Sequence, residues 1–253
     1  MREKNTPDST LKMGYRNVAP SVTVAPLSNK IHTDTTDIFI LQVDVMKNAQ
    51  GSAFLTVGGT KVTCAVFGPL FIPNKKSLSA TDGNLEIYVN SLPFSLKDNR
   101  TDYKPTVDDE NVAEKIRESF RDVIKLDRYP RNTVRIEVTI LENSGSLVST
   151  CVNCTSAALM SAAIEMNDIP VAVDTAIHQG ENELSLKNQP STIDEESAGG
   201  VLTLTSLLGR NEISFVDLVV KDEQLELKEV VKVMQSSLNE CSVVHARIKS
   251  FFY

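Results

Sequence analysis

The segment that most constrains the fold of this 253-residue chain is an alternating strand that leads through a turn into a helix of small side chains. Residues 133–142 place Val134, Ile136, Val138 and Ile140 on one side, which predicts a half-buried strand. Residues 143–146, Asn-Ser-Gly-Ser, are typical of a turn. Residues 149–166 are rich in Ser, Ala, Thr and Cys and predict a helix that packs closely against a sheet.

The remaining predicted elements follow the order of strands and then a helix, twice over. In the first half, strands are expected over residues 38–46, 51–57, 60–67 and 85–92. A helix should follow them, capped by Asp108 or Asp109 and continuing to Leu126. In the second half, strands are expected over residues 171–177, 181–186, 200–207 and 212–218, and a long helix over 223–249. This order predicts an α+β domain with two similar halves. Residues 1–36, rich in Pro, Ser, Thr and Asn, predict an extended or partly disordered arm.

The overall charge argues against a free-standing nucleic-acid binder. The chain carries a formal net charge of −7, whereas such binders usually have the basic excess that neutralises phosphates. Any contact with RNA therefore requires a local basic patch or a surface shared with partners. No stretch approaches 18 uninterrupted apolar residues, and the amino terminus has no apolar run, so we expect neither a membrane span nor a secretory signal.

Few residue patterns indicate catalytic chemistry. Cys151 and Cys154 have the spacing of a redox or zinc motif, but no second ligand pair accompanies them, and two packed, reduced thiols on a helix explain them better. The acidic run 194–196 is compatible either with a magnesium site or, more commonly, with a solvated loop or a helix N-terminus. We expect no metal site and no cofactor.

Four stretches, in order along the chain, resemble the RNase PH superfamily. They are the strands and turn over 51–55 and 59–69, the Arg-Tyr-Pro-Arg segment 128–131, the loop 141–148, and the acidic segment 189–196. The resemblance implies the RNase PH fold, which is like domain 2 of ribosomal protein S5, over residues 37–253. It also suggests where an active site of this family would lie.

The departures from the family pattern fall on the residues that would hold phosphate. An arginine of the family's phosphate loop corresponds to Val148, and a second arginine corresponds to Asp108, where an acid would repel phosphate. The family's leading acidic residue corresponds to Gln189, which cannot carry a charge, while Asp194 and Glu195 remain in the acidic segment. The resemblance therefore implies a degenerate site and no phosphorolytic activity.

This combination is similar to the inactive ring subunits of the eukaryotic RNA exosome. Two of these subunits belong to one subclass, and either of them could be the one that this chain resembles more. It implies a non-catalytic subunit that forms a heterodimer within a hexameric ring of RNase PH-like subunits. Further implied partners are cap subunits with S1/KH domains, a hydrolytic nuclease subunit, and RNA in the central channel, with no membrane. The implied localisation is the nucleus, nucleolus and cytoplasm, and the strands near 57–67 and 85–92 are candidates for pairing between subunits.

Local basic residues remain candidates for RNA contact or, alternatively, ordinary solvated charges. They are Lys75, Lys76, Lys97, Arg100, Lys104, Arg128 and Arg131. Two other functions stay open from the sequence. One is an active phosphorolytic 3′–5′ exoribonuclease that uses unusual residues, and the other is a free-standing protein-interaction domain.

Overall fold

The computed structural model describes residues 38–71, 82–95, 105–179, 184–221 and 227–252. The expectation of an N-terminal arm over residues 1–36 lies outside this part of the chain. Within it, no helix combines the length and the hydrophobicity needed to cross a membrane.

The first half of the chain forms a five-stranded sheet in the order β1-β2-β3-β5-β4. Three antiparallel strands come first, and β4 then pairs in parallel with β5 because the connecting helix α1 returns the chain to the same end of the sheet. The bounds are β1 Phe39–Val43, β2 Gly51–Val57, β3 Thr60–Phe71, β4 Asn84–Ser91 and β5 Asn132–Glu142. The predicted alternation in β5 is confirmed, since its four inward side chains are at most 1% exposed.

The second half forms a four-stranded antiparallel sheet in the order β7-β6-β8-β9. Its strands are β6 Pro170–Gln179, β7 Leu184–Asn188, β8 Gly200–Leu207 and β9 Glu212–Val220. The two halves are thus each a sheet with its helices, as expected, but only the first half contains a parallel pair.

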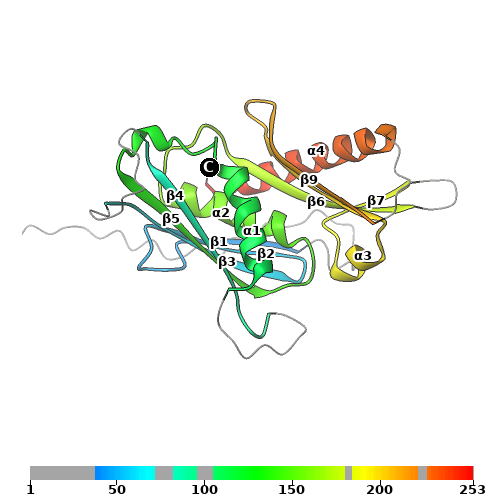
Figure 1. Cartoon of the computed structure of the whole chain (residues 1–253), viewed down its shortest axis with the longest axis horizontal. Coiled ribbons are helices and arrows are strands. Elements are labelled where there is room, and N and C mark those ends of the chain that lie inside the picture. Colours follow the sequence, from blue (N-terminus) through cyan, green and yellow to red (C-terminus); the bar gives the residue numbers. More distant parts are fainter. Residues whose placement is uncertain (1–37, 72–81, 96–104, 180–183, 222–226, 253) are drawn as a thin grey trace, which may run out of the picture.

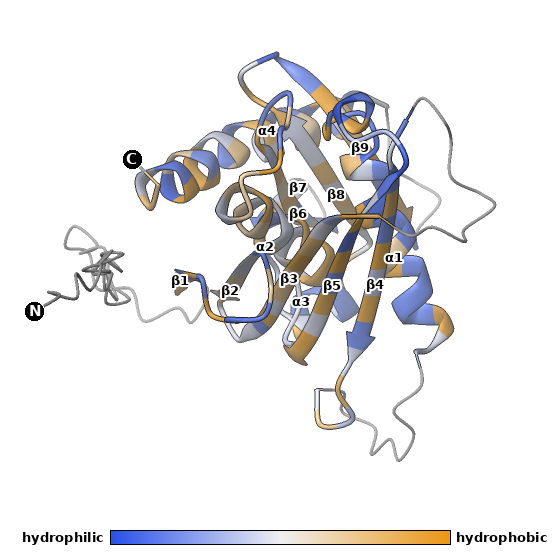
Figure 2. Ribbon diagram, turned by 90° about the vertical axis from the view of Figure 1, so that its left-hand side faces the viewer, coloured by the Kyte–Doolittle hydropathy of each residue, from blue (hydrophilic) through white to orange (hydrophobic). Residues whose placement is uncertain are grey.

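The helices lie in two layers. Helix α1, Val107–Phe120, and helix α2, Leu147–Ser161, lie between the two sheets, and α4, Leu227–Ser250, covers the other face of the second sheet (Figure 1). The short helix α3, Thr192–Ser197, and a 3₁₀ turn η2, Leu126–Arg128, complete the described elements. In Figure 2 the polar side of α4 is turned to solvent, as expected for an amphipathic surface helix.

Helix α2 is buried along most of its length because sheets lie on both sides of it. Its small side chains allow this close packing, and Cys151, Cys154, Ala157 and Ala158 have no exposed surface. The buried Asn153 amide takes the place of a neighbouring strand, since it donates to Ala172 O and accepts from Ala172 N, both at 2.9 Å. The prediction of a closely packed small-residue helix is therefore confirmed.

Sequence-based expectations about the ends of two helices were wrong, and one short helix was missed. Helix α1 begins at Val107, and Thr106 is its N-cap, while Asp109 completes a capping box from inside the first turn. Helix α2 begins two residues earlier and ends five residues earlier than predicted. Helix α3 was not predicted as a separate element, although a helix N-terminus was one reading of its acidic run.

The expectation that residues 57–67 pair with another subunit was also wrong. Strand β3 lies inside its sheet and is hydrogen-bonded to β2 on one side and β5 on the other. Strand β4 lies at an edge, so residues 85–92 remain candidates for pairing.

The close approach of β2 to α2 leads to a stability prediction. A Cβ on Gly51 would lie 2.2 Å from Ala162 N and 2.5 Å from Ala158 O, and this backbone cannot retreat because α2 is held by both sheets. We expect Gly51→Ala to lower the free energy of unfolding by about 2 kcal/mol or more, measured by urea denaturation. In the control Gly209→Ala the new Cβ meets only the carboxyl group of Asp168, 3.0 Å away, which can shift. Equal losses in the two variants would contradict this explanation.

Candidate functional site

The loop before α2 packs against the segment that joins β7 to α3, and this contact forms what we call the α2 N-terminal site. It comprises residues 144–149, Asp174 and residues 189–195. Thr192 N donates to Ser144 O at 2.9 Å, and the Ser146 hydroxyl donates to Pro190 O at 2.9 Å. Thr60 fixes the loop from the other side, because its hydroxyl donates to Gly145 O at 2.6 Å and accepts from Ser144 N at 3.0 Å.

Gly145 makes this close contact sterically feasible. Its φ of +111° lies in a region that L side chains rarely adopt, and a Cβ there would be 2.4 Å from Pro190 O. The facing segment is also constrained, since Gln189 has a φ of +53° and its N–H donates to Asp174 O at 2.8 Å. The glycine of the Asn-Ser-Gly-Ser turn thus brings two distant loops into backbone contact.

Two carboxylates of the chain bind the N–H groups at the start of α2. Glu195 Oε1 accepts from Ser146 N at 2.7 Å, and Asp174 Oδ2 accepts from Ser149 N at 3.2 Å and from the Ser149 hydroxyl at 2.8 Å. The first N–H groups of a helix have no partner within the helix and attract anions. These positions are the ones that a bound phosphate would use at such a helix end, and here internal side chains use them.

Burial shifts the titration of these carboxylates. Desolvation raises the pKa of Asp174, which is 3% exposed, and the hydrogen bonds from Ser149 only partly offset it. Desolvation likewise raises the pKa of Glu195, against the effect of the Ser146 N–H. The pKa of Asp194 is instead lowered to about 2 by the Lys187 ammonium, 2.8 Å away, and by the Ser191 hydroxyl.

Three lysines surround the site, and each is already engaged within the chain. Lys187 pairs with Asp194, Lys115 pairs with Asp217 at 2.6 Å, and Lys221 donates to the carbonyl oxygens of Glu195 and Glu196 at 2.7 and 3.0 Å. Part of the hydrogen-bonding capacity of each ammonium group is therefore used within the chain. The arrangement is therefore well suited to holding the two loops together.

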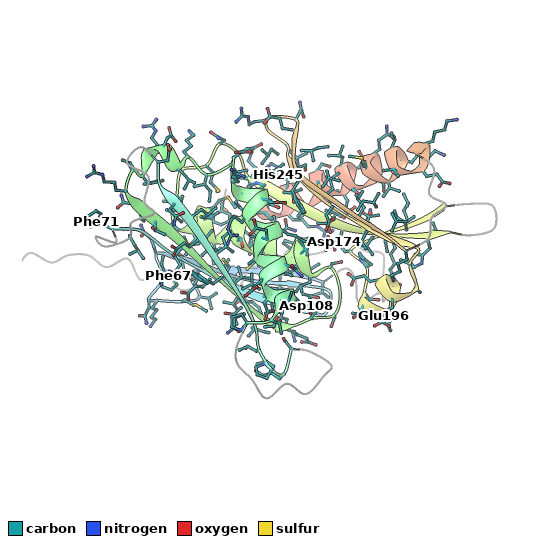
Figure 3. All side chains as sticks on the ribbon, in the orientation of Figure 1. Phe67, Phe71, Asp108, Asp174, Glu196 and His245 are labelled. Carbon is teal, nitrogen blue, oxygen red and sulfur yellow. The ribbon has the colours of Figure 1, made fainter. Side chains whose placement is uncertain are left out.

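Four of the five residues singled out from the sequence gather at this site. Val148 lies in the first turn of α2, half-buried against the core, and Gln189, Asp194 and Glu195 lie on the facing segment. Asp108 does not join them through any described contact and is exposed near the start of α1 (Figure 3). Its neighbour Asp109 turns inward instead and accepts from the Ser91 hydroxyl at 2.5 Å.

The basic residues proposed for RNA contact do not gather at this site in the described structure. Lys75, Lys76, Lys97, Arg100 and Lys104 lie outside the described residues. Arg128 and Arg131 are exposed beside the first residue of β5, whereas α2 follows the last residue of β5. The length of this strand separates the two places by roughly 35 Å.

Cysteine and metal chemistry find no support in the described residues. Cys64, Cys151, Cys154 and Cys241 are all buried and unpaired, and burial raises the pKa of the Cys64 thiol to about 12. Within the described residues no group of three or more His, Cys, Asp or Glu side chains is placed to hold a metal ion.

Sequence reasoning missed Asp174, which is central to the site. A signal was present, because this aspartate stands between Val173 and Thr175 in a strand that the sequence predicted. A buried carboxylate requires hydrogen-bond donors, and these come from Thr203 of β8 and from Ser149 of α2, which are distant from Asp174 in the sequence. The sequence alone does not show that Asp174 and its hydrogen-bond donors lie together.

The raised pKa of Asp174 predicts a pH dependence of stability. Because the folded protein holds this proton more tightly than the unfolded chain, the contribution of Asp174 is greatest below the ordinary aspartate value of 3.8 and is lost as the pH rises through the raised value. Asp174→Asn keeps an oxygen acceptor for Ser149 but has no proton to lose. We expect its free energy of unfolding to rise relative to wild type as the pH increases above the ordinary aspartate value of 3.8, measured by urea titrations at several pH values.

The exposed Asp127→Asn is a matched control and should follow wild type across the same pH range. A constant difference between Asp174→Asn and wild type at every pH would show that Asp174 does not titrate in this way.

Comparison with known proteins places this geometry in a family. The family model described as 3′ exoribonuclease family, domain 1 (RNase PH) matches residues 38–165. A Caenorhabditis elegans protein provisionally named exosome complex component RRP41 is 29% identical over 203 residues, 79% of this chain and 80% of the relative. Exosome complex component Rrp41 of Pyrobaculum calidifontis is 31% identical over 141 residues, 55% of this chain and 57% of the relative.

The fold has a counterpart among solved structures. The crystal structure of rice (Oryza sativa) Rrp46 superimposes with a TM-score of 0.73 at 17% identity, covering 85% of this chain and 93% of the rice chain. The described topology, the loop before α2 and the family match over half of the chain agree with one another. The chain belongs to the RNase PH family.

Proposed function

We propose that this chain is a non-catalytic ring subunit of an RNA exosome, where it forms part of the wall around the RNA channel for 3′–5′ processing and degradation. The observation that carries the proposal is the occupation of the α2 N-terminus by Glu195 and Asp174. In a phosphorolytic member of the family, an anion is expected at this helix end. Here the chain supplies its own anions.

The names of the relatives support the assembly part of the proposal. The Caenorhabditis and Pyrobaculum proteins are named as exosome complex components, and so is ski6 of Schizosaccharomyces pombe, which is 28% identical over 71% of this chain. The order of motifs further favours, among inactive ring subunits, the one called mRNA transport regulator three. Its implied partners are neighbouring RNase PH-like subunits, S1/KH cap subunits and a hydrolytic nuclease, in the nucleus, nucleolus and cytoplasm.

Electrostatics support the absence of catalysis. Phosphorolysis needs a phosphate nucleophile that is held in place and a cationic environment for the developing charge. Val148 supplies an apolar side chain where the family has an arginine, and the carboxylates of Glu195 and Asp174 lie where phosphate would approach. Because Ser146 N and Ser149 N already donate to these carboxyl groups, they are not available to hold phosphate, so phosphate binding is disfavoured.

The alternative is an active phosphorolytic exoribonuclease. It is favoured by one observation, the description of the matching family as 3′ exoribonucleases. In this case Asp194 or Glu195 would take part in the reaction, although both already serve structural hydrogen bonds.

An activity assay distinguishes the two functions. We expect the purified chain, incubated with single-stranded RNA and orthophosphate, to release no nucleoside diphosphates above a phosphate-free control, measured by thin-layer chromatography of labelled RNA. Release that depends on phosphate and is abolished by Asp194→Asn or Glu195→Gln would establish the alternative.

A mass measurement tests whether the chain assembles with other subunits into a ring. Native mass spectrometry of the chain, purified under physiological salt from the cells that produce it, should give a complex that contains several other RNase PH-like subunits. A monomer at this step would contradict the proposed assembly and favour a free-standing interaction domain.

A further inference from the structure

One side of the molecule presents one edge strand of each sheet together with α1. In Figure 1, β4, α1 and β9 face the viewer, with α1 between the two strands. Strand β4 ends the first sheet and β9 ends the second, and α1 packs against both of them. Lys115 and Ser119 on α1 fix β9, through the ion pair to Asp217 and a 2.6 Å hydrogen bond from the Ser214 hydroxyl to Ser119 O. We call this the β4–α1–β9 face.

Strand β9 is an unusually apolar edge. Four of its nine residues, Ile213, Val216, Val219 and Val220, are large hydrophobics that are 39–53% exposed. The strand contains neither proline nor lysine, and both of its acidic residues are already paired, Asp217 with Lys115 and Glu212 with Arg210. Soluble proteins usually protect free edges with such residues, so an unprotected apolar edge indicates a surface that another chain covers.

Helix α1 gives this face its charge. Glu110, Glu114 and Glu118 follow one another at a spacing of four residues along the exposed side of the helix. Like charges at this spacing destabilise a helix slightly. Arg117 pairs with Glu114, whereas Glu110 and Glu118 make no ion pair with any other described residue. A cationic partner would relieve this repulsion.

The open edge of β9 and the row of glutamates on α1 together indicate the chemistry of the partner. The open edge of β9 offers backbone donors and acceptors to an extended segment, as in β-strand addition. The glutamate row offers complementary charge to Lys or Arg on that partner and repels RNA phosphates. The fitting partner is therefore a protein with an extended, apolar segment flanked by cationic side chains.

The geometry points to the β4–α1–β9 face as the surface on which a neighbouring subunit of the ring docks, through an extended segment along β9 and cations opposite Glu110 and Glu118. This inference rests on the proposed function and adds the face and the partner chemistry to it.

The test compares the complexes formed by tagged variants of the full chain in cells. Val219→Asp places a charge on the β9 edge, and Glu110→Lys/Glu118→Lys reverses the free charges of α1. We expect each to reduce recovery of neighbouring subunits more than tenfold, measured by quantitative mass spectrometry after affinity purification. Raising the salt concentration should also release wild-type neighbours, because the opposed charges are partly exposed.

Matched controls use exposed residues of the same types elsewhere. Val243→Asp on α4, where the valine is 43% exposed, and Asp127→Lys/Glu137→Lys on η2 and β5 should recover neighbours like wild type. Equal recovery with the test and control variants would overturn the docking face while wild-type assembly still upholds the ring. A wild-type chain that recovers no RNase PH-like subunit would overturn both.

A second measurement needs no variant and so does not depend on their folding. Zero-length carboxyl–amine cross-linking of the wild-type complex should join Glu110 or Glu118 to lysines of a neighbouring subunit. Cross-links to neighbours that arise only from other faces, or loss of the neighbours after ribonuclease treatment, would overturn the inference.

Discussion

The burial of α2 between two sheets is the constraint on which the rest of the structure depends. Because its backbone approaches β2 closely, small side chains are required along it and a glycine at position 51 of β2. Because β6 lies on its other side, the buried Asn153 amide is bonded to backbone atoms of that strand. The same packing fixes the direction of the helix, and thereby the place where its N–H groups emerge.

The N–H groups at the N-terminus of α2 matter both for the stability of the fold and for the function of the site. Any protein that buries a helix N-terminus must provide acceptors for it, and a bound phosphate is one way to do so. This chain uses Glu195 from α3 and Asp174 from β6, which joins the second half of the molecule to the first without a ligand. The same N–H groups that could bind an anion therefore serve here to hold the two halves together.

The charge distribution agrees with a role in assembly. A net charge of −7 disfavours RNA binding over much of the surface, and the row of glutamates on α1 lies beside an apolar sheet edge rather than beside a basic groove. Such a subunit would contribute part of the channel wall and contacts to neighbouring subunits. The cations that bind RNA would then come from a few local positions on this chain or from the neighbouring subunits.

The sequence by itself determined the local elements. The strands over 51–57 and 200–207 were predicted to the residue, and the apolar alternation in β5 and the small side chains of α2 indicated their surroundings, because both patterns reflect local periodicity. It also marked Val148, Gln189 and Glu195 as neighbours of a family site. The tertiary structure alone decided that Asp174 caps α2, that β3 is interior and that Asp108 stands apart. Those facts depend on contacts between residues 25 or more apart in the chain, or on which strands lie side by side, and neither leaves a periodic trace in the sequence.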